Sequence, residues 1–121
     1  MIISTLRIEP PPKKHLHVLD ILRSVQGPTL AQPGCVSCDI FVDSGLDRAI
    51  LFFEQWECEA ALHQHIGSDL YRRILAAIEL AKTRPEIHFH LVSTTQGMEL
   101  VERLRRSADA THAKPGSSDQ E

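Results

Sequence analysis

The chain has 121 residues, which is enough for one domain with a modest core, and its 42% hydrophobic and 24% charged residues are ordinary for a globular protein. A formal net charge of −3 argues against a nucleic-acid partner or an anionic membrane surface. No apolar run approaches the roughly 20 residues that a membrane span needs, and the N-terminus lacks a signal-peptide layout. We therefore expect a cytoplasmic protein.

The first part of the chain alternates extended and helical patterns. Residues 2–9 form the first predicted strand, and the three prolines at 10–12 end it and begin a helix, because proline fits the first turn of a helix. Leucine and valine recur at helical spacing over residues 13–25, and the Gly-Pro pair at 27–28 is expected to break this helix. The Pro-Gly pair at 33–34 then predicts a turn.

A hairpin and two helices follow. Residues 35–43 and 48–56 are the second and third predicted strands, joined by a polar connection that contains a glycine. A short helix over residues 59–66 is expected to end at Gly67, and Ser68 is expected to cap the next helix, whose region ends before Pro85.

The last elements are a fourth strand over residues 87–95 and a further amphipathic helix over 98–106. We place the main domain in residues 1–96 and a helical extension in 97–106. Residues 107–121 are rich in serine, alanine and charge and have no apolar anchors, which is typical of a disordered tail.

The order β-α-β-β-α-β with an extra C-terminal helix predicts an α+β, ferredoxin-like fold with a four-stranded antiparallel sheet. Two helices would cover one face of the sheet. The run Ile50-Leu51-Phe52-Phe53 leaves neither face of the third strand polar, so the second face also needs a cover. A second copy of the sheet would provide one, which predicts a homodimer through the sheet faces.

Three cysteines, Cys35, Cys38 and Cys58, cannot all pair with one another, and an odd count fits reduced thiols. Cys35 and Cys38 have the spacing of redox or zinc motifs, but they lie in a predicted strand. Three residues apart on a regular strand, their side chains would point to opposite faces, which suits neither a disulfide nor a shared metal.

The most informative segment joins the third strand to the following helix. Strand alternation places Phe52, Glu54 and Trp56 on one face, so a carboxylate and an indole lie side by side where the helix begins. Two histidines, His63 and His65, follow within this helix. Histidine is the natural acid or base near neutral pH.

This segment and the order of elements resemble the antibiotic biosynthesis monooxygenase domain, a small dimeric α+β barrel, over residues 2–95. The matching features are Pro33-Gly34-Cys35, Glu54-x-Trp56, Ala61-Leu62 and His65-x-x-Ser68. Active members of this family oxidise quinol-like or phenolic substrates with molecular oxygen and use neither metal nor flavin. The resemblance therefore implies a cofactor-independent monooxygenase with a small aromatic substrate.

Such a reaction needs a base, an apolar pocket and donors that stabilise an anion. The resemblance makes His65 the base or anion stabiliser, and we expect Glu54 to orient it. Further residues are expected to contact the substrate, as apolar walls or polar groups: Trp56, Phe52, Phe89, Tyr71 and His90.

Two rival functions remain at this stage. One is a non-enzymatic small-molecule binding module of the same fold. The other is a metal-binding protein, because His88 and His90 share a face of the fourth strand and could bind zinc or copper with a third ligand such as His65 or Glu54. Each candidate site residue also has a purely structural interpretation. For Trp56, this interpretation is that it belongs to the core.

Overall fold

The computed structural model describes residues 1–113 and contains one four-stranded antiparallel sheet with the order β2-β3-β1-β4. The elements are β1 (Ile2–Ile8), the 3-10 turn η1 (Pro12–Lys14), α1 (His15–Leu30), β2 (Cys35–Val42), β3 (Ile50–Trp56), α2 (Glu59–Ile66), α3 (Tyr71–Glu79), β4 (Glu86–Leu91) and α4 (Met98–Ala113). The predicted ferredoxin-like α+β fold is confirmed. None of the helices in the described range is both long and apolar enough to cross a membrane.

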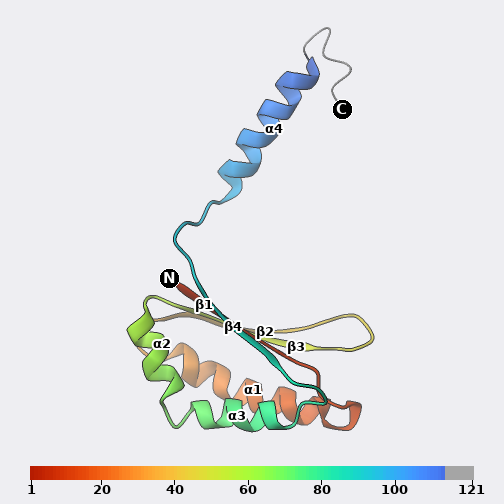
Figure 1. Cartoon of the computed structure of the whole chain (residues 1–121), viewed down its shortest axis with the longest axis vertical. Helices are drawn as coiled ribbons and strands as arrows, with labels where there is room; N and C mark the ends of the chain where they lie inside the picture. Colours follow the sequence, from red (N-terminus) through yellow and green to blue (C-terminus); the bar gives the residue numbers. More distant parts are fainter. Residues whose placement is uncertain (114–121) are drawn as a thin grey trace.

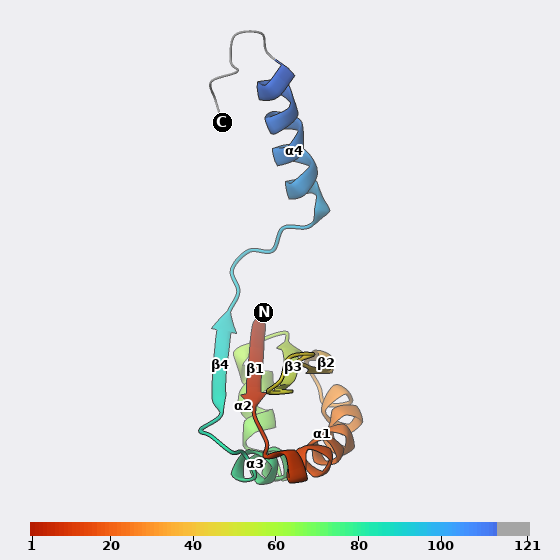
Figure 2. The ribbon, with the colours of Figure 1, turned by 90° about the vertical axis from the view of Figure 1, so that its right-hand side faces the viewer.

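Helices α1, α2 and α3 lie on one side of the sheet, which we call the covered face, and leave the other side, the open face, without a helix (Figures 1 and 2). Strand alternation explains the division, since every second residue of β1 and β3 is buried. The main core lies between the covered face and α1 and α3, and it includes Leu6, Leu22, Val25, Phe52 and Ile74.

Helix α1 continues through Pro28 to Leu30, so the predicted break at residues 27–28 is wrong. Proline removes one hydrogen bond from the helix. Packing holds the last turn in place, because Thr29 is fully buried and the backbone N–H of Ala31 still donates to the carbonyl of Gly27.

Helix α2 ends at Gly67, as the sequence predicts. The prediction that Ser68 caps α3 is wrong. The Ser68 hydroxyl donates instead to the carbonyl of His65, 2.7 Å away, and so completes the end of α2. Helix α3 starts only at Tyr71, with Leu70 at the capping position and no side-chain cap.

Helix α4 extends away from the rest of the chain after the connection 92–97 (Figures 1 and 2). It runs to Ala113, so residues 107–113, assigned to the tail by composition, are helical. Alanine is a strong helix former and no proline occurs between Pro85 and Pro115, which explains the longer helix. The rest of the predicted tail, 114–121, lies outside the described residues.

Candidate functional site

A buried acid–imidazole pair lies between the covered face and α2. Glu54 comes from β3 and His65 from the last turn of α2, and their side chains meet with 3.0 Å between Glu54 Oε2 and His65 Nε2. The residues are only 2% and 1% exposed. A charged group this deep in a protein is retained only with partners, because desolvation of an isolated charge is expensive.

Trp56 provides the second partner of the Glu54 carboxylate. Its indole Nε1 donates to Glu54 Oε1 over 3.1 Å, and its ring stacks on the imidazole of His65 with 4.7 Å between centroids. Strand alternation places Glu54 and Trp56 on the same face, two residues apart. Both carboxylate oxygens therefore have a hydrogen-bond partner, and the imidazole is clamped against a flat apolar surface.

Gln32 completes the group, and sequence reasoning missed it. Its Oε1 atom lies 2.6 Å from Nδ1 of His65, on the side of the ring opposite Glu54. Gln32 belongs to the turn between α1 and β2, where its backbone N–H donates to Thr29 and its carbonyl accepts from Cys35. A polar residue beside the predicted Pro-Gly turn gave no signal of this contact, because 33 positions separate it from His65.

Tyr71, at the start of α3, touches the same imidazole edge-on, with 5.3 Å between ring centroids. Burial and the nearby Glu54 carboxylate raise the pKa of its phenol above the ordinary value. The same two causes raise the pKa of Cys35 to about 11 and also raise that of Cys38. All three groups are therefore neutral at pH 7.

Cys35 and Cys38 lie on the same face of β2, so the expectation of opposite faces is wrong. Cys35 pairs with Trp56 and Cys38 with Glu54, both on the covered face, because the register shifts between Cys35 and Ser37. Such a β-bulge adds one residue and reverses the alternation after it. Both cysteines are free thiols.

A small hollow of about 120 Å³ opens beside His65. It lies where the turn before β2 meets α2, and its lining residues are Gln32, Pro33, Ala61, Gln64, His65 and Ser68. Gly34 makes the close approach of these two segments possible: a Cβ atom there would lie 2.5 Å from that of Ala61. Of the His65 group, Gln32 and His65 line this hollow, and the His65 side chain itself is fully buried.

The other residues predicted for the site lie at different distances from this group. Phe52 is buried on the covered face, two positions before Glu54, and Phe89 is on the same face of edge strand β4 with 39% exposure. His90 pairs with Ile3 and so lies on the open face. The structure brings Glu54, Trp56, His65 and Tyr71 together, and it leaves His90 outside.

The metal site that combined His88 and His90 with His65 or Glu54 is excluded by the same alternation. The two β4 imidazoles stack on each other on the open face, with 6.0 Å between centroids, whereas Glu54 and His65 lie beneath the covered face. Within residues 1–113, no group of three or more metal-ligating side chains comes together.

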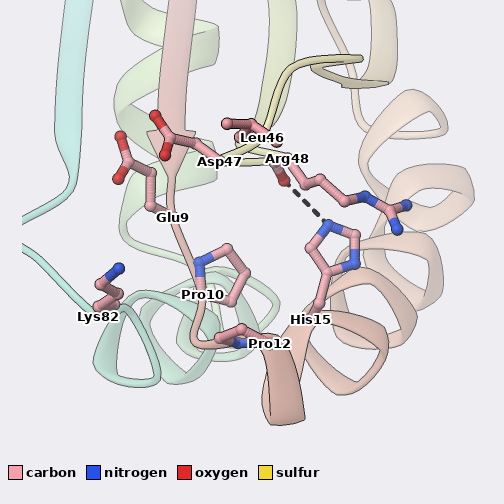
Figure 3. A pocket seen from close by; sticks show the side chains of 8 residues that line it. All are labelled: Glu9, Pro10, Pro12, His15, Leu46, Asp47, Arg48 and Lys82. Carbon is pink, nitrogen blue, oxygen red and sulfur yellow. Dashed lines mark hydrogen bonds between the residues drawn. The ribbon is translucent and has the colours of Figure 1, made fainter.

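A larger hollow of about 190 Å³ lies at the opposite end of the sheet, where β1 ends and the β2–β3 loop turns (Figure 3). His15 bonds the carbonyl of Arg48 there over 2.9 Å, and the carboxylates of Glu9 and Asp47 and the amine of Lys82 line its rim. These charges are mixed; Asp47 and Lys82 are exposed and Glu9 is half-buried beside Arg7, so none of them is as deeply buried as His65. The His65 group is therefore the stronger candidate site.

Comparisons with known proteins place these observations in a family. The family model described as antibiotic biosynthesis monooxygenase matches residues 1–77. Rv0793 from Mycobacterium tuberculosis superimposes with a TM-score of 0.72 at 22% identity, covering 79% of this chain and 98% of that one. A crystal structure of an antibiotic biosynthesis monooxygenase gives a TM-score of 0.70 at 21% identity, covering 78% and 100%.

A curated relative, the uncharacterized protein sll1783 from Synechocystis, is 25% identical over 97 residues, which are 79% of this chain and 65% of the relative. The chain thus spans somewhat less than two thirds of that relative's length. Since the family model covers more than half of the chain, the protein belongs to the antibiotic biosynthesis monooxygenase family.

Proposed function

We propose that this member of the antibiotic biosynthesis monooxygenase family is a cofactor-independent monooxygenase that oxidises a quinol-like or phenolic small molecule with O2. The observation that carries the proposal is the buried Glu54–His65 pair, in which 3.0 Å separates Glu54 Oε2 from His65 Nε2 and His65 lines a hollow. A histidine held by a carboxylate and placed beside a cavity is the arrangement that proton transfer or anion stabilisation requires.

The reaction balances without an external reductant. A phenol with hydrogen at the para carbon reacts with O2 to give a quinone and water: one oxygen atom becomes the new carbonyl, and the other leaves as water with the two hydrogens. The phenolate is the electron-rich form that reduces oxygen. His65 is proposed as the base or the anion stabiliser, Glu54 as its orienting partner, and Trp56 and Tyr71 as the walls that fix the imidazole.

The test is oxygen uptake by metal-stripped protein against a panel of phenols and hydroquinones, with ¹⁸O2 to follow the label into the product. We expect His65→Gln to abolish uptake and the matched variant His63→Gln, at an exposed position on the same helix, to retain it. Equal uptake by wild type and His65→Gln would contradict the proposal. Ligand-induced stabilisation without uptake would instead indicate a binding module of the same fold.

We also propose that the protein is a homodimer through the open face, as members of this family are generally dimeric. Phe53 and Leu51 are half-buried on this face, and Phe41 is 53% exposed beside Phe53, with 6.5 Å between their rings. Sedimentation equilibrium should show a dimer that Phe53→Lys dissociates. The control Leu75→Lys, an equally apolar but helical surface position on α3, should leave the dimer intact.

A further inference from the structure

Both ring nitrogens of His65 face oxygen atoms. Nε2 lies 3.0 Å from a carboxylate oxygen of Glu54, and Nδ1 lies 2.6 Å from the amide oxygen of Gln32. Carboxylate and amide carbonyl oxygens accept hydrogen bonds and do not donate them. A neutral imidazole has one N–H and could satisfy only one of these acceptors, whereas an imidazolium has two.

We infer that Gln32 holds His65 as an imidazolium, and that the adjoining hollow binds a phenolate whose oxygen replaces the Gln32 amide oxygen at Nδ1. In this arrangement Gln32 is a positioning residue that acts through His65. The inference rests on the proposed function and refines it, because it selects anion stabilisation over base catalysis and names the ionised form of the ligand.

The orientation of the Gln32 amide decides between the two roles of His65. With the carbonyl oxygen toward the ring, Nδ1 must carry a proton. Rotation of the amide by half a turn would present an N–H instead and would require a neutral ring with a free lone pair on Nδ1. The two states of the ring differ by one proton, so a measurement that counts protons on His65 distinguishes them.

The charges around the ring are consistent with a cation. Glu54 from β3 faces the ring with one oxygen of its carboxyl group, and Trp56 donates to the other oxygen. The remaining titratable groups near it, Tyr71 from α3 and the thiols of Cys35 and Cys38 from β2, stay neutral because burial and Glu54 raise their pKa values. These neutral groups therefore add no charge beside the Glu54–His65 pair, and each member of the pair has a further hydrogen bond, as a stable buried pair requires.

Gln32 and His65 both line the hollow, and the His65 side chain is fully buried, so a ligand reaches Nδ1 only when the Gln32 amide moves away from it. A phenolate oxygen that displaces the neutral amide oxygen would form a charge-assisted hydrogen bond, which is roughly twice as strong as a neutral one. The volume of about 120 Å³ is somewhat below the roughly 150 Å³ of an engineered cavity that holds benzene. This favours a ligand with one aromatic ring.

The first test counts protons by NMR on protein with ¹⁵N-labelled histidine. We expect both ring nitrogens of His65 to be protonated at pH 7. Gln32→Leu, which keeps the size of the side chain but removes the acceptor, should leave only Nε2 protonated, and Gln32→Glu should keep both protons. A single protonated nitrogen in the wild-type protein would overturn the inference, whatever the variants do.

The second test uses 4-nitrophenol, whose anion is yellow and whose neutral form is not. Below the pH at which the free probe ionises, the ratio of anion to neutral form should be about tenfold or more higher for bound than for free probe. His65→Gln, which removes the proposed cationic donor, should lose this excess. Binding of the neutral form, or no binding, would overturn the phenolate assignment. Anion binding without oxygen uptake would instead refute the proposed oxygenase activity and leave this inference standing.

Discussion

The two faces of the sheet carry the same strands but different chemistry. On β3, Glu54 and Trp56 point to the covered face, where their side-chain polar atoms are buried and hydrogen-bonded. The alternate residues Phe53 and Gln55 point to the open face. His65 and the β4 pair His88 and His90 differ in the same way. A residue type acquires a role here through its burial and partners, and those depend on which face it occupies.

The largest effect is expected from removing the carboxylate on the covered face. Glu54→Ala should lower the free energy of unfolding by about 3–5 kcal/mol, because it leaves the buried His65 ring and the Trp56 N–H without their acceptor. Urea unfolding measures the loss. The control is Gln55→Ala, the next residue on the opposite face, which bonds only Ser37 and should cost at most about 1 kcal/mol. Equal losses of unfolding free energy in the two variants would contradict the difference between the covered and the open face.

Close packing on the covered side predicts a second large effect at Gly34. Its φ of +83° is unfavourable for other residues, and a Cβ atom would lie 2.5 Å from that of Ala61, so Gly34→Ala should cost about 2–4 kcal/mol. A double-mutant cycle with Ala61→Gly separates the two causes by thermal or urea unfolding. The pair should interact favourably, since the second change relieves the contact; strict additivity would show that strain in φ alone is responsible.

Periodicity was sufficient to predict most of the covered face, because burial follows alternation along β1 and β3. It also indicated that Glu54 and Trp56 share a face and that a histidine-bearing helix follows. It failed where the backbone departs from regular geometry. Because of the β-bulge before Ser37, Cys35 and Cys38 lie on the same face of β2. Helix α1 continues past Pro28 because packing stabilises its last turn.

The contact between Gln32 and His65 could not be predicted for a different reason. It joins a turn to a helix across 33 positions, and neither segment has a periodic pattern that would place the other. Such a contact depends on how α1 and α2 pack against the sheet, and packing is a property of the whole fold.

The free thiols of Cys35 and Cys58 provide a further comparison, between a half-buried and an exposed position. Burial and Glu54 raise the pKa of Cys35 to about 11, so its thiolate at pH 8 should be about 100-fold scarcer than that of an unperturbed thiol. Iodoacetamide labelling followed by mass spectrometry should modify exposed Cys58 first, and Cys35 increasingly as pH approaches 11. Glu54→Gln should speed labelling of Cys35. Similar rates for Cys35 and Cys58 at pH 8 would contradict this account.

The sign of the corresponding stability effect follows from the raised pKa. The folded protein holds the thiol proton more tightly than the unfolded chain, so the stabilising contribution is complete below the ordinary thiol pKa of 9.0 and disappears as pH rises toward about 11. The free energy of unfolding should therefore fall over this range. A Cys35→Ser variant should show a smaller fall, because its hydroxyl does not titrate there.

The smallest effect is expected at Thr29, which is fully buried near the end of α1. Among residues 1–113, its hydroxyl oxygen is the one buried side-chain nitrogen or oxygen atom without a hydrogen-bond partner. Thr29→Val keeps the shape and removes the unpaired group, so it should raise the free energy of unfolding by about 1 kcal/mol.

Thr29→Ser is the matched control for this last change, since it keeps the hydroxyl and deletes a buried methyl group; it should lower the free energy of unfolding by about 1 kcal/mol. If Thr29→Val also destabilises the protein, the hydroxyl has a partner such as a buried water, and the covered face is fully satisfied. If Thr29→Val stabilises the protein, the hydroxyl of Thr29 on α1 is a buried polar group without a partner, whereas the polar groups around Glu54 are all paired. Full pairing would then be specific to the His65 group, where a charge has to be held in place.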